Sequence, residues 1–274
     1  MSCIQLNLRH YRAYPQRDFL GHVTETVEID VDKTAFVLVD VYGLGFSEED
    51  ATPHPRSSMD IWTVDQEKKV NVERIKPSLD AARALGLPVI YVSNSAPRIA
   101  LSKSQFAKQL KRSLDIVFEE LCAEDNIDPR QYYYGSSEFL KHSKLLEPRE
   151  GDYYIRKLYY GGFKDTHLDA LLRDLDVKTL VFVGYAADVC LHCTMIDALN
   201  LNYEVIFLRD CTLANLELFP QETKGTYGFT ERIVMWSEVY VGRSTTSVDF
   251  IEACNAAKKE SGSVAEETAT SRSS

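Results

Sequence analysis

The sequence predicts an α/β protein in which a six-stranded parallel sheet is covered by helices on both faces. Three observations support this prediction: six short apolar runs recur along the chain, most of them are apolar at consecutive positions, and helical patterns lie between them. Strands that alternate with helices are typical of a parallel sheet with right-handed crossovers, which gives a three-layer α/β/α architecture. A chain of 274 residues can build this fold as one domain.

The strands are expected where the six apolar runs lie. Apolar residues, many of them β-branched, follow one another in these runs, as they do in strands that are buried on both faces. The runs occupy residues 34–40, 88–93, 153–157, 179–184, 204–209 and 232–236.

Helices are expected between these strands. The longest spans residues 66–86, where apolar residues form one stripe and Gly86 marks the end of the helix. Pro77 either kinks this helix or starts a second one. Two shorter helices are expected at 167–175 and 188–200. The stripe consists of Val70, Ile75, Leu79, Ala82 and Leu85.

Three segments lie outside this alternation. Residues 1–30 are interpreted as an irregular N-terminal arm, so the main domain is expected to span 31–254. Residues 99–150 contain a basic helical stretch at 103–121 and no strong strand, which indicates an insertion or lid over the edge of the sheet. Residues 255–274 are small and polar, as is typical of a disordered tail. The insertion also carries Tyr132, Tyr133 and Tyr134, which either line a lid or pack within the insertion.

Composition and charge exclude several classes of protein. A formal net charge of −10 argues against a nucleic-acid binder, which would show a basic stripe. The longest apolar runs are too short to cross a bilayer, and no apolar run of a signal peptide follows the basic N-terminal residues. Six unevenly spaced cysteines are unlike a disulfide framework. We therefore expect a cytoplasmic protein without a nucleic-acid or membrane partner.

Three reactive side chains lie where predicted strands end. Asp40 ends the first strand, Lys157 ends the third, and Cys190 lies shortly after the fourth, near the start of the next helix. Ligands of open parallel sheets bind outside the carboxyl ends of the strands, so these residues are expected to meet at one site. Each has a simpler interpretation, as a turn residue, a solvated charge or a small buried side chain, and it is their joint placement that indicates chemistry.

A thiol in the first turn of a helix is suited to nucleophilic catalysis. Unpaired N–H groups and the positive end of the helix dipole stabilise the thiolate of Cys190, and a lysine nearby lowers its pKa further. A carboxylate accepts the thiol proton and later returns it. The tight segment Tyr185, Ala186 and Ala187 can direct backbone N–H groups at a developing oxyanion.

Three sequence blocks resemble a known family. The blocks are FVLVDV at the first strand, DYYIRKLYYGGFKDTHLDALL, and VKTLVFVGYAADVCLHCTMIDALNLNYEVIFLRDCT, within about residues 34–215. In them the chain resembles the isochorismatase-like cysteine hydrolases, a superfamily that includes nicotinamidases, N-carbamoylsarcosine amidase, biuret hydrolase and ureidoacrylate amidohydrolase. The resemblance implies hydrolysis of a small amide, carbamoyl or ureido C–N bond through a thioester, usually with release of ammonia, without a cofactor and in a homodimer or homotetramer.

The resemblance also implies roles for particular residues. The catalytic triad of the family corresponds to Asp40, Lys157 and Cys190. The backbone N–H groups of Ala186 and Cys190 would form the oxyanion hole, with a cis peptide bond between Tyr185 and Ala186. Phe163 corresponds to an aromatic residue that commonly walls the pocket.

The chain departs from the family in two places. The family often reads Asp-x-Gln-Asn at its first strand, whereas Tyr42 follows Asp40 at the second position here and leaves the floor of the pocket in question. The histidine metal ligands of nicotinamidases are missing after the second strand, so we expect no metal. Asn94 and Arg98 lie there instead, where they are expected to bind a ureido group and a carboxylate of the substrate. Tyr42 and Tyr185 are expected to add an aromatic wall to the pocket.

Other interpretations of the same residues stay open at this point. Cys190 and Cys193 form a C-x-x-C pair, which suggests redox chemistry, although the thioredoxin context is missing. Zinc is conceivable on those two cysteines with His192 and Cys211. A vinyl-ether hydrolase of the isochorismatase type, which needs no thiol, and a catalytically silent binding relative are the functional alternatives.

Overall fold

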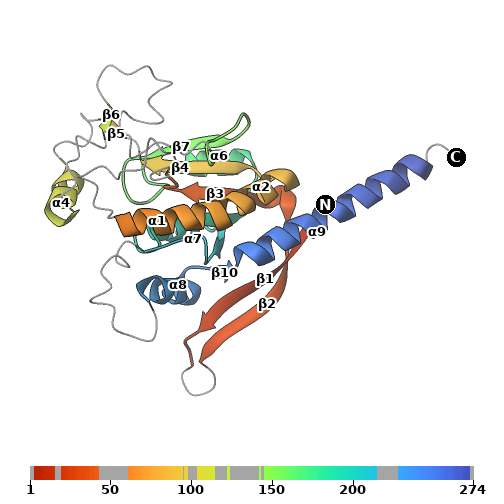
Figure 1. Cartoon of the computed structure of the whole chain (residues 1–274), viewed down its shortest axis with the longest axis horizontal. Helices are drawn as coiled ribbons and strands as arrows, with labels where there is room; N and C mark the ends of the chain where they lie inside the picture. Colours follow the sequence, from red (N-terminus) through yellow and green to blue (C-terminus); the bar gives the residue numbers. More distant parts are fainter. Residues whose placement is uncertain are drawn as a thin grey trace.

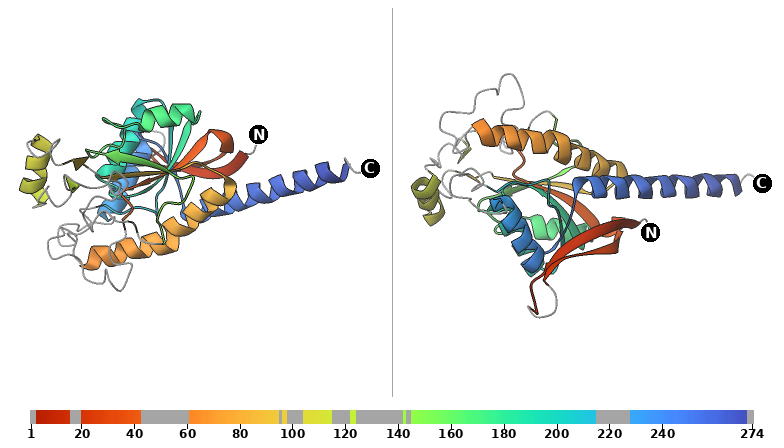
Figure 2. Two further views of the ribbon diagram at one scale, coloured as in Figure 1. Left: turned by 90° about the horizontal axis from the view of Figure 1, so that it is seen from above. Right: turned by 60° about the horizontal axis from the view of Figure 1, so that its bottom comes forward.

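The computed structural model describes most of the chain, with helices on both sides of a central twisted sheet (Figures 1 and 2). The described residues are 3–15, 20–42, 61–94, 96–97, 104–114, 122–123, 142, 145–214 and 228–271. Arg98 and the three consecutive tyrosines of the insertion lie outside them.

The central sheet has eight strands in the order β2-β1-β10-β9-β8-β3-β4-β7. Six of them, from β10 to β7, pair in parallel, which confirms the predicted parallel sheet. The strands are β1 (Cys3–Arg12), β2 (Gly21–Asp30), β3 (Thr34–Val39), β4 (Val89–Asn94), β7 (Tyr153–Lys157), β8 (Thr179–Gly184), β9 (Glu204–Leu208) and β10 (Arg243–Thr245). A separate pair of short strands is formed by β5 (Ala96–Pro97) and β6 (Cys122–Ala123).

The N-terminal residues are not an irregular arm, which corrects the sequence-based expectation. Strands β1 and β2 form an antiparallel hairpin, and β1 pairs with β10 through Arg9 and Ser244. Ile4, Leu6 and Leu8 are buried, whereas the residues between them face outward. This alternation with a period of two is the pattern of a strand with one buried face, so the hairpin extends the central sheet from six strands to eight.

The sixth apolar run was assigned to the wrong kind of element. Residues 232–236 lie within helix α8 (Phe229–Tyr240), and the sixth parallel strand is β10, which comes just after it. The buried residues of α8 are Val234, Ser237 and Glu238, at the spacing of one helical face. A short apolar run does not by itself distinguish a strand from a buried helix segment.

The long predicted helix consists of three successive parts: α1 (Ile61–Val70), a π-helical turn (Asn71–Ile75) and α2 (Lys76–Leu85). Pro77 lies in the first turn of α2, directly after the π-helical turn, so it starts a helix segment. Gly86 ends α2 with a φ of 84°, a left-handed conformation that favours glycine. The remaining described helices before α8 are a short 3-10 turn (Val31–Lys33), α4 (Gln105–Leu114), α6 (Leu168–Asp174) and α7 (Cys190–Asn200).

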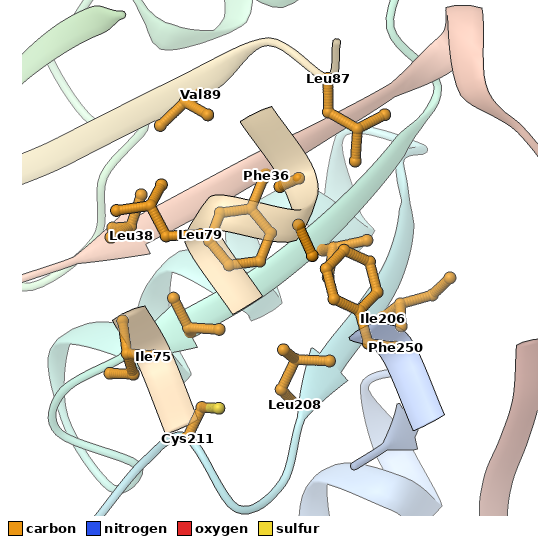
Figure 3. Packing of buried hydrophobic residues seen from close by; sticks show 14 of the residues in the cluster. Phe36, Leu38, Ile75, Leu79, Leu87, Val89, Ile206, Leu208, Cys211 and Phe250 are labelled. Atoms are coloured by element: carbon orange, nitrogen blue, oxygen red, sulfur yellow. The ribbon is translucent and has the colours of Figure 1, made fainter. Parts of the chain in front are cut away.

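Two apolar cores, one on each face of the sheet, confirm the three-layer architecture. On one face Phe36 of β3 packs with Leu79 of α2 and with Phe250 of the C-terminal helix α9 (Ser247–Ser271) (Figure 3). On the other face Phe182 of β8 belongs to the same buried cluster as Met195 of α7, together with residues of α6 and α8.

The C-terminal residues are helical rather than disordered, at least as far as Ser271. Cys254 and Ala257 are buried, so the helix packs on the sheet beyond the expected end of the domain at residue 254. Farther on, the segment is rich in Ala, Glu and Lys, which favour a helix, and it extends away from the body of the protein (Figure 1). A small and polar composition was therefore a poor indicator of disorder here.

Candidate functional site

Four neighbouring strands bring the candidate residues to one edge of the sheet. Strands β8, β3, β4 and β7 are adjacent and parallel, so their carboxyl ends lie side by side. Asp40 directly follows β3, Asn94 ends β4 opposite Lys157 at the end of β7, and Cys190 begins the helix that follows β8. The structure thus brings together the three reactive residues that the sequence placed at strand ends.

Asp40 and Lys157 form a buried ion pair. The Lys157 Nζ lies 2.7 Å from Oδ2 of Asp40, and the exposed fractions of the side chains are 0% and 7%. Burial lowers the pKa of Lys157, but its interactions with Asp40 and Cys190 outweigh burial, and the pKa is raised overall. The lysine is therefore a fixed positive charge within the site.

Asn94 joins the ion pair through both its backbone and its side chain. Its backbone N–H donates to Oδ1 of Asp40 over 3.2 Å, and its side-chain amide donates to Oδ2 over 3.4 Å. The Asn94 side-chain oxygen accepts a hydrogen bond from Lys157. Asn94 thus hydrogen-bonds to both Asp40 and Lys157. The sequence analysis expected it to bind the substrate.

The Cys190 thiol lies against this pair. It is hydrogen-bonded to Asp40 and Lys157, and the residue is only partly exposed. Burial raises the pKa of the thiol, Lys157 lowers it and Asp40 raises it, with a large net increase. The expectation of a stabilised thiolate is therefore wrong for the resting site. Burial and the neighbouring carboxylate outweigh the lysine, so the resting thiol keeps its proton beside a carboxylate that can accept it.

The segment before Cys190 has the backbone that the family resemblance implied. The peptide bond between Tyr185 and Ala186 is cis. The N–H of Ala187 donates to Leu213, and the N–H of Val189 donates to the carbonyl of Ala186. Within the described part of the chain, the backbone N–H groups of Ala186 and Cys190 have no such acceptor.

Two aromatic residues that were expected to wall a pocket are packed inside the protein. Phe163 is 9% exposed and stacks on Tyr203, with 6.0 Å between the ring centroids. Tyr185 is 5% exposed, and its hydroxyl donates to the side-chain oxygen of Asn71 over 2.8 Å. Tyr185 thus belongs to one buried core of the sheet and Phe163 to the other.

The residues of the conceivable zinc site do not converge. The His192 ring packs on Trp236, and its Nδ1 lies 3.5 Å from the Ser237 hydroxyl. Cys211 is buried in the core on the opposite face of the sheet from the Cys190 helix. Among the residues that the structure describes, no group of three or more His, Cys, Asp or Glu side chains is arranged to hold a metal ion.

None of the described helices is long and apolar enough to span a membrane.

Two residues near the site were missed by sequence reasoning. Nδ1 of His142 donates to the carbonyl of Val41 over 2.8 Å, and its ring lies 6.2 Å from the ring of Tyr42. The side-chain amide of Asn71 donates to the carbonyl of Tyr42 over 3.5 Å. Both come from segments far from Asp40 in the chain, and no local pattern marks them.

Comparisons with known proteins agree with this fold. Residues 135–222 match the isochorismatase domain family. A cysteine hydrolase structure from Pseudomonas syringae pv. phaseolicola superposes with a TM-score of 0.61 at 23% identity, covering 84% of this chain and 95% of that one. An N-carbamoylsarcosine amidase structure from Thermoplasma acidophilum superposes with a TM-score of 0.50 at 23% identity, covering 78% and 96%.

Sequence relatives point the same way. A ureidoacrylate amidohydrolase from Agrobacterium fabrum is 30% identical over 154 residues, which are 53% of this chain and 62% of the relative. A ureidoacrylate amidohydrolase from Azorhizobium caulinodans is 27% identical over 199 residues, which are 69% of this chain and 79% of the relative. The alignment thus spans less than two thirds of the first relative's length. The matched domain and these relatives make the chain similar to isochorismatase-like hydrolases over part of its length, and the solved structures share its fold.

Proposed function

We propose that this protein hydrolyses the C–N bond of a small amide, carbamoyl or ureido compound through a thioester on Cys190. The observation that carries the proposal is the contact of one thiol with a buried carboxylate and a buried ammonium. The backbone N–H groups of Ala186 and Cys190 lie beside this contact in the chain and have no backbone acceptor among the described residues. The names of the sequence relatives and of the amidase structure support the same class of substrate.

In the first step Asp40 takes the proton of the thiol as sulfur attacks the carbonyl carbon. The backbone N–H groups of Ala186 and Cys190 donate hydrogen bonds to the carbonyl oxygen and stabilise the negative charge that develops on it. The protonated Asp40 then donates to the departing nitrogen, the C–N bond breaks, and an amine or ammonia leaves. Water, deprotonated by the same carboxylate, attacks the thioester, and the acid is released with the thiol restored.

Lys157 has an electrostatic role in this sequence. It stabilises the carboxylate of Asp40 before the attack and stabilises negative charge on sulfur during it. Burial raises the pKa of the resting thiol, and Asp40 is in place to accept its proton as the attack proceeds.

A panel of amides, followed by ammonia release, tests this proposal. We expect turnover of at least one ureido, carbamoyl or simple carboxamide compound, and we expect N-carbamoyl acids to be preferred to nicotinamide. Cys190→Ala should abolish turnover while the protein stays folded. Cys193→Ala, which removes the other thiol of the same helix, is the matched control and should keep most of the activity.

Two results would contradict the proposal. Equal activity of the two cysteine variants would exclude Cys190 as the nucleophile. Turnover of a vinyl ether by Cys190→Ala, with no amide hydrolysed by the wild type, would favour the isochorismatase-type reaction. Turnover of nicotinamide alone would leave the mechanism intact and overturn the preferred substrate class.

We also propose a cellular compartment and an oligomeric state for the protein. Five cysteines in the described part of the chain, Cys3, Cys190, Cys193, Cys211 and Cys254, are all unpaired, which supports a reducing compartment such as the cytoplasm. Assembly as a homodimer or homotetramer is proposed from the family resemblance.

A further inference from the structure

Tyr42 lies at the second position after Asp40 and was expected to be part of an aromatic pocket wall. Its hydroxyl instead lies 2.6 Å from Oδ1 of Asp40. It also lies 2.9 Å from the backbone nitrogen of Asn94. The phenol is therefore engaged with the carboxylate of the candidate triad and with the end of strand β4.

The direction of the hydrogen bond to Asp40 follows from chemistry. A backbone N–H can only donate, so the Tyr42 oxygen accepts from Asn94. The single phenolic proton is then directed at Asp40, whose ionised carboxylate can only accept. Burial and the charge of Asp40 raise the pKa of Tyr42 well above its usual value, so the phenol keeps this proton throughout the working pH range.

Other residues hold Tyr42 in place. The amide of Asn71 donates to its carbonyl, and the ring of His142 lies close to its ring. His142 also binds the carbonyl of Val41, the residue between Asp40 and Tyr42. The hydroxyl thus has a fixed position relative to the carboxylate, as a donor that orients a reacting group requires.

The two oxygens of Asp40 consequently have different partners. Oδ1 receives the Tyr42 hydroxyl and the Asn94 backbone N–H, whereas Oδ2 receives Lys157 and the Asn94 side chain. We propose that Tyr42 is a positioning residue that orients the Asp40 carboxylate toward Cys190 and holds it ionised through the hydrogen bond to Oδ1. This role rests on the proposed function only in that Asp40 takes the proton of the thiol.

Alkylation of Cys190 by iodoacetamide tests the role without any substrate. In this reaction the S–H proton passes to Asp40, a C–S bond forms at the carbon of iodoacetamide, and iodide leaves. Protonation of Asp40 at low pH stops this transfer, so the alkylation rate has an acid limb. Cys190→Ala gives the background from the other cysteines, which is subtracted.

Tyr42→Phe removes the donor and keeps the ring. Loss of a hydrogen bond to the carboxylate should move the acid limb to higher pH by about one unit. With an active substrate, kcat should fall roughly ten-fold while KM stays unchanged, because the hydroxyl binds Asp40 and not the substrate. The matched control is Tyr203→Phe, which removes another tyrosine–aspartate hydrogen bond, to Asp169 over 2.9 Å, away from the site. It should leave the acid limb in place.

A second variant covers the case in which Tyr42→Phe does not fold. A 3-fluorotyrosine in place of Tyr42 keeps the hydroxyl and makes it a stronger donor, so the acid limb should move to lower pH. An acid limb that coincides with that of the wild type in both variants would overturn the proposal, as would a rise in KM with unchanged kcat. A protein that shows the shifts but releases ammonia from no amide would refute the proposed function and leave the role of Tyr42 standing.

Discussion

Glu67 of helix α1 is a half-buried carboxyl group beside the candidate site. Burial raises its pKa to about 7 from an ordinary value of 4.5. Its charge also adds to the raised pKa of Tyr185, after the burial of that residue. A carboxyl group in this position favours its neutral form, which makes the stability of the fold depend on pH.

The sign of this dependence follows from the shift. The folded state binds the Glu67 proton more tightly than the unfolded state, so the stability associated with Glu67 is complete below pH 4.5 and is lost as the pH rises through about 7. Glu67→Gln should therefore raise the free energy of unfolding at pH 8 by about 1–2 kcal/mol and change little at pH 4.5. Urea denaturation at the two pH values measures this difference.

The matched control for Glu67→Gln is Glu73→Gln. Glu73 lies in the following π-helical turn, and its side chain is exposed. Its replacement should have the same small effect at both pH values. An equal response of the two variants would show that the burial of Glu67 does not control its protonation.

At the scale of elements, Glu238 of α8 connects the N-terminal hairpin to the rest of the sheet. Its side chain is 0% exposed, and its Oε1 accepts from Nε of Arg9 on β1 over 2.8 Å. His22 of β2 lies 3.0 Å from Oε2, and the Ser244 hydroxyl of β10 also donates to the carboxylate. One carboxylate therefore binds three strands from a single helix.

Removing the charge of Glu238 should loosen the hairpin. Glu238→Gln keeps the size of the side chain but weakens the bonds to Arg9 and Ser244, so the free energy of unfolding should fall by about 2 kcal/mol. Hydrogen exchange should become faster in β1 and β2 before it does so in β3. Glu28→Gln on β2, where the carboxylate is exposed and bonded to Gln5, is the control and should change stability by less than about 0.5 kcal/mol. Uniform destabilisation without faster exchange in the hairpin would contradict this role.

Local sequence patterns predicted the ends of some helices correctly and assigned one apolar run to the wrong kind of element. The end of α2 at Gly86 and its start near Pro77 were recognised because glycine and proline restrict the backbone at their own positions. The assignment of 232–236 to a strand failed because a five-residue apolar run fits a buried strand and a buried helix face equally well.

At the scale of the whole molecule, helix α9 contributes unevenly to the fold. Phe250, Cys254 and Ala257 are buried against the sheet, and Phe250 stacks on Phe36 with 5.7 Å between the centroids. The C-terminal part of the helix extends away from the body of the protein (Figure 1). The core therefore depends on the first three turns of α9.

Two truncations test this division. A chain that ends after Lys258 should unfold with a free energy within about 0.5 kcal/mol of the full chain, because it retains the buried residues Phe250, Cys254 and Ala257. A chain that ends after Asp249 loses Phe250 and the residues that follow, and it should be destabilised by more than about 3 kcal/mol. Urea midpoints of the two truncated proteins and the full chain provide the measurement. Similar stability of both truncated chains would mean that α9 does not complete the core.

The α/β class, the parallel strands and the meeting of Asp40, Lys157 and Cys190 at one edge of the sheet could be predicted from the sequence. These features follow from periodicity and from the rule that parallel strands share their carboxyl ends, which depend on neighbours along the chain. The hairpin in the sheet, the burial that raises the pKa of the Cys190 thiol, and the bonds of Tyr42 and Asn94 to Asp40 became visible only in the folded structure. These features depend on burial and on contacts between residues that are distant in the chain. Local sequence patterns do not predict either of them.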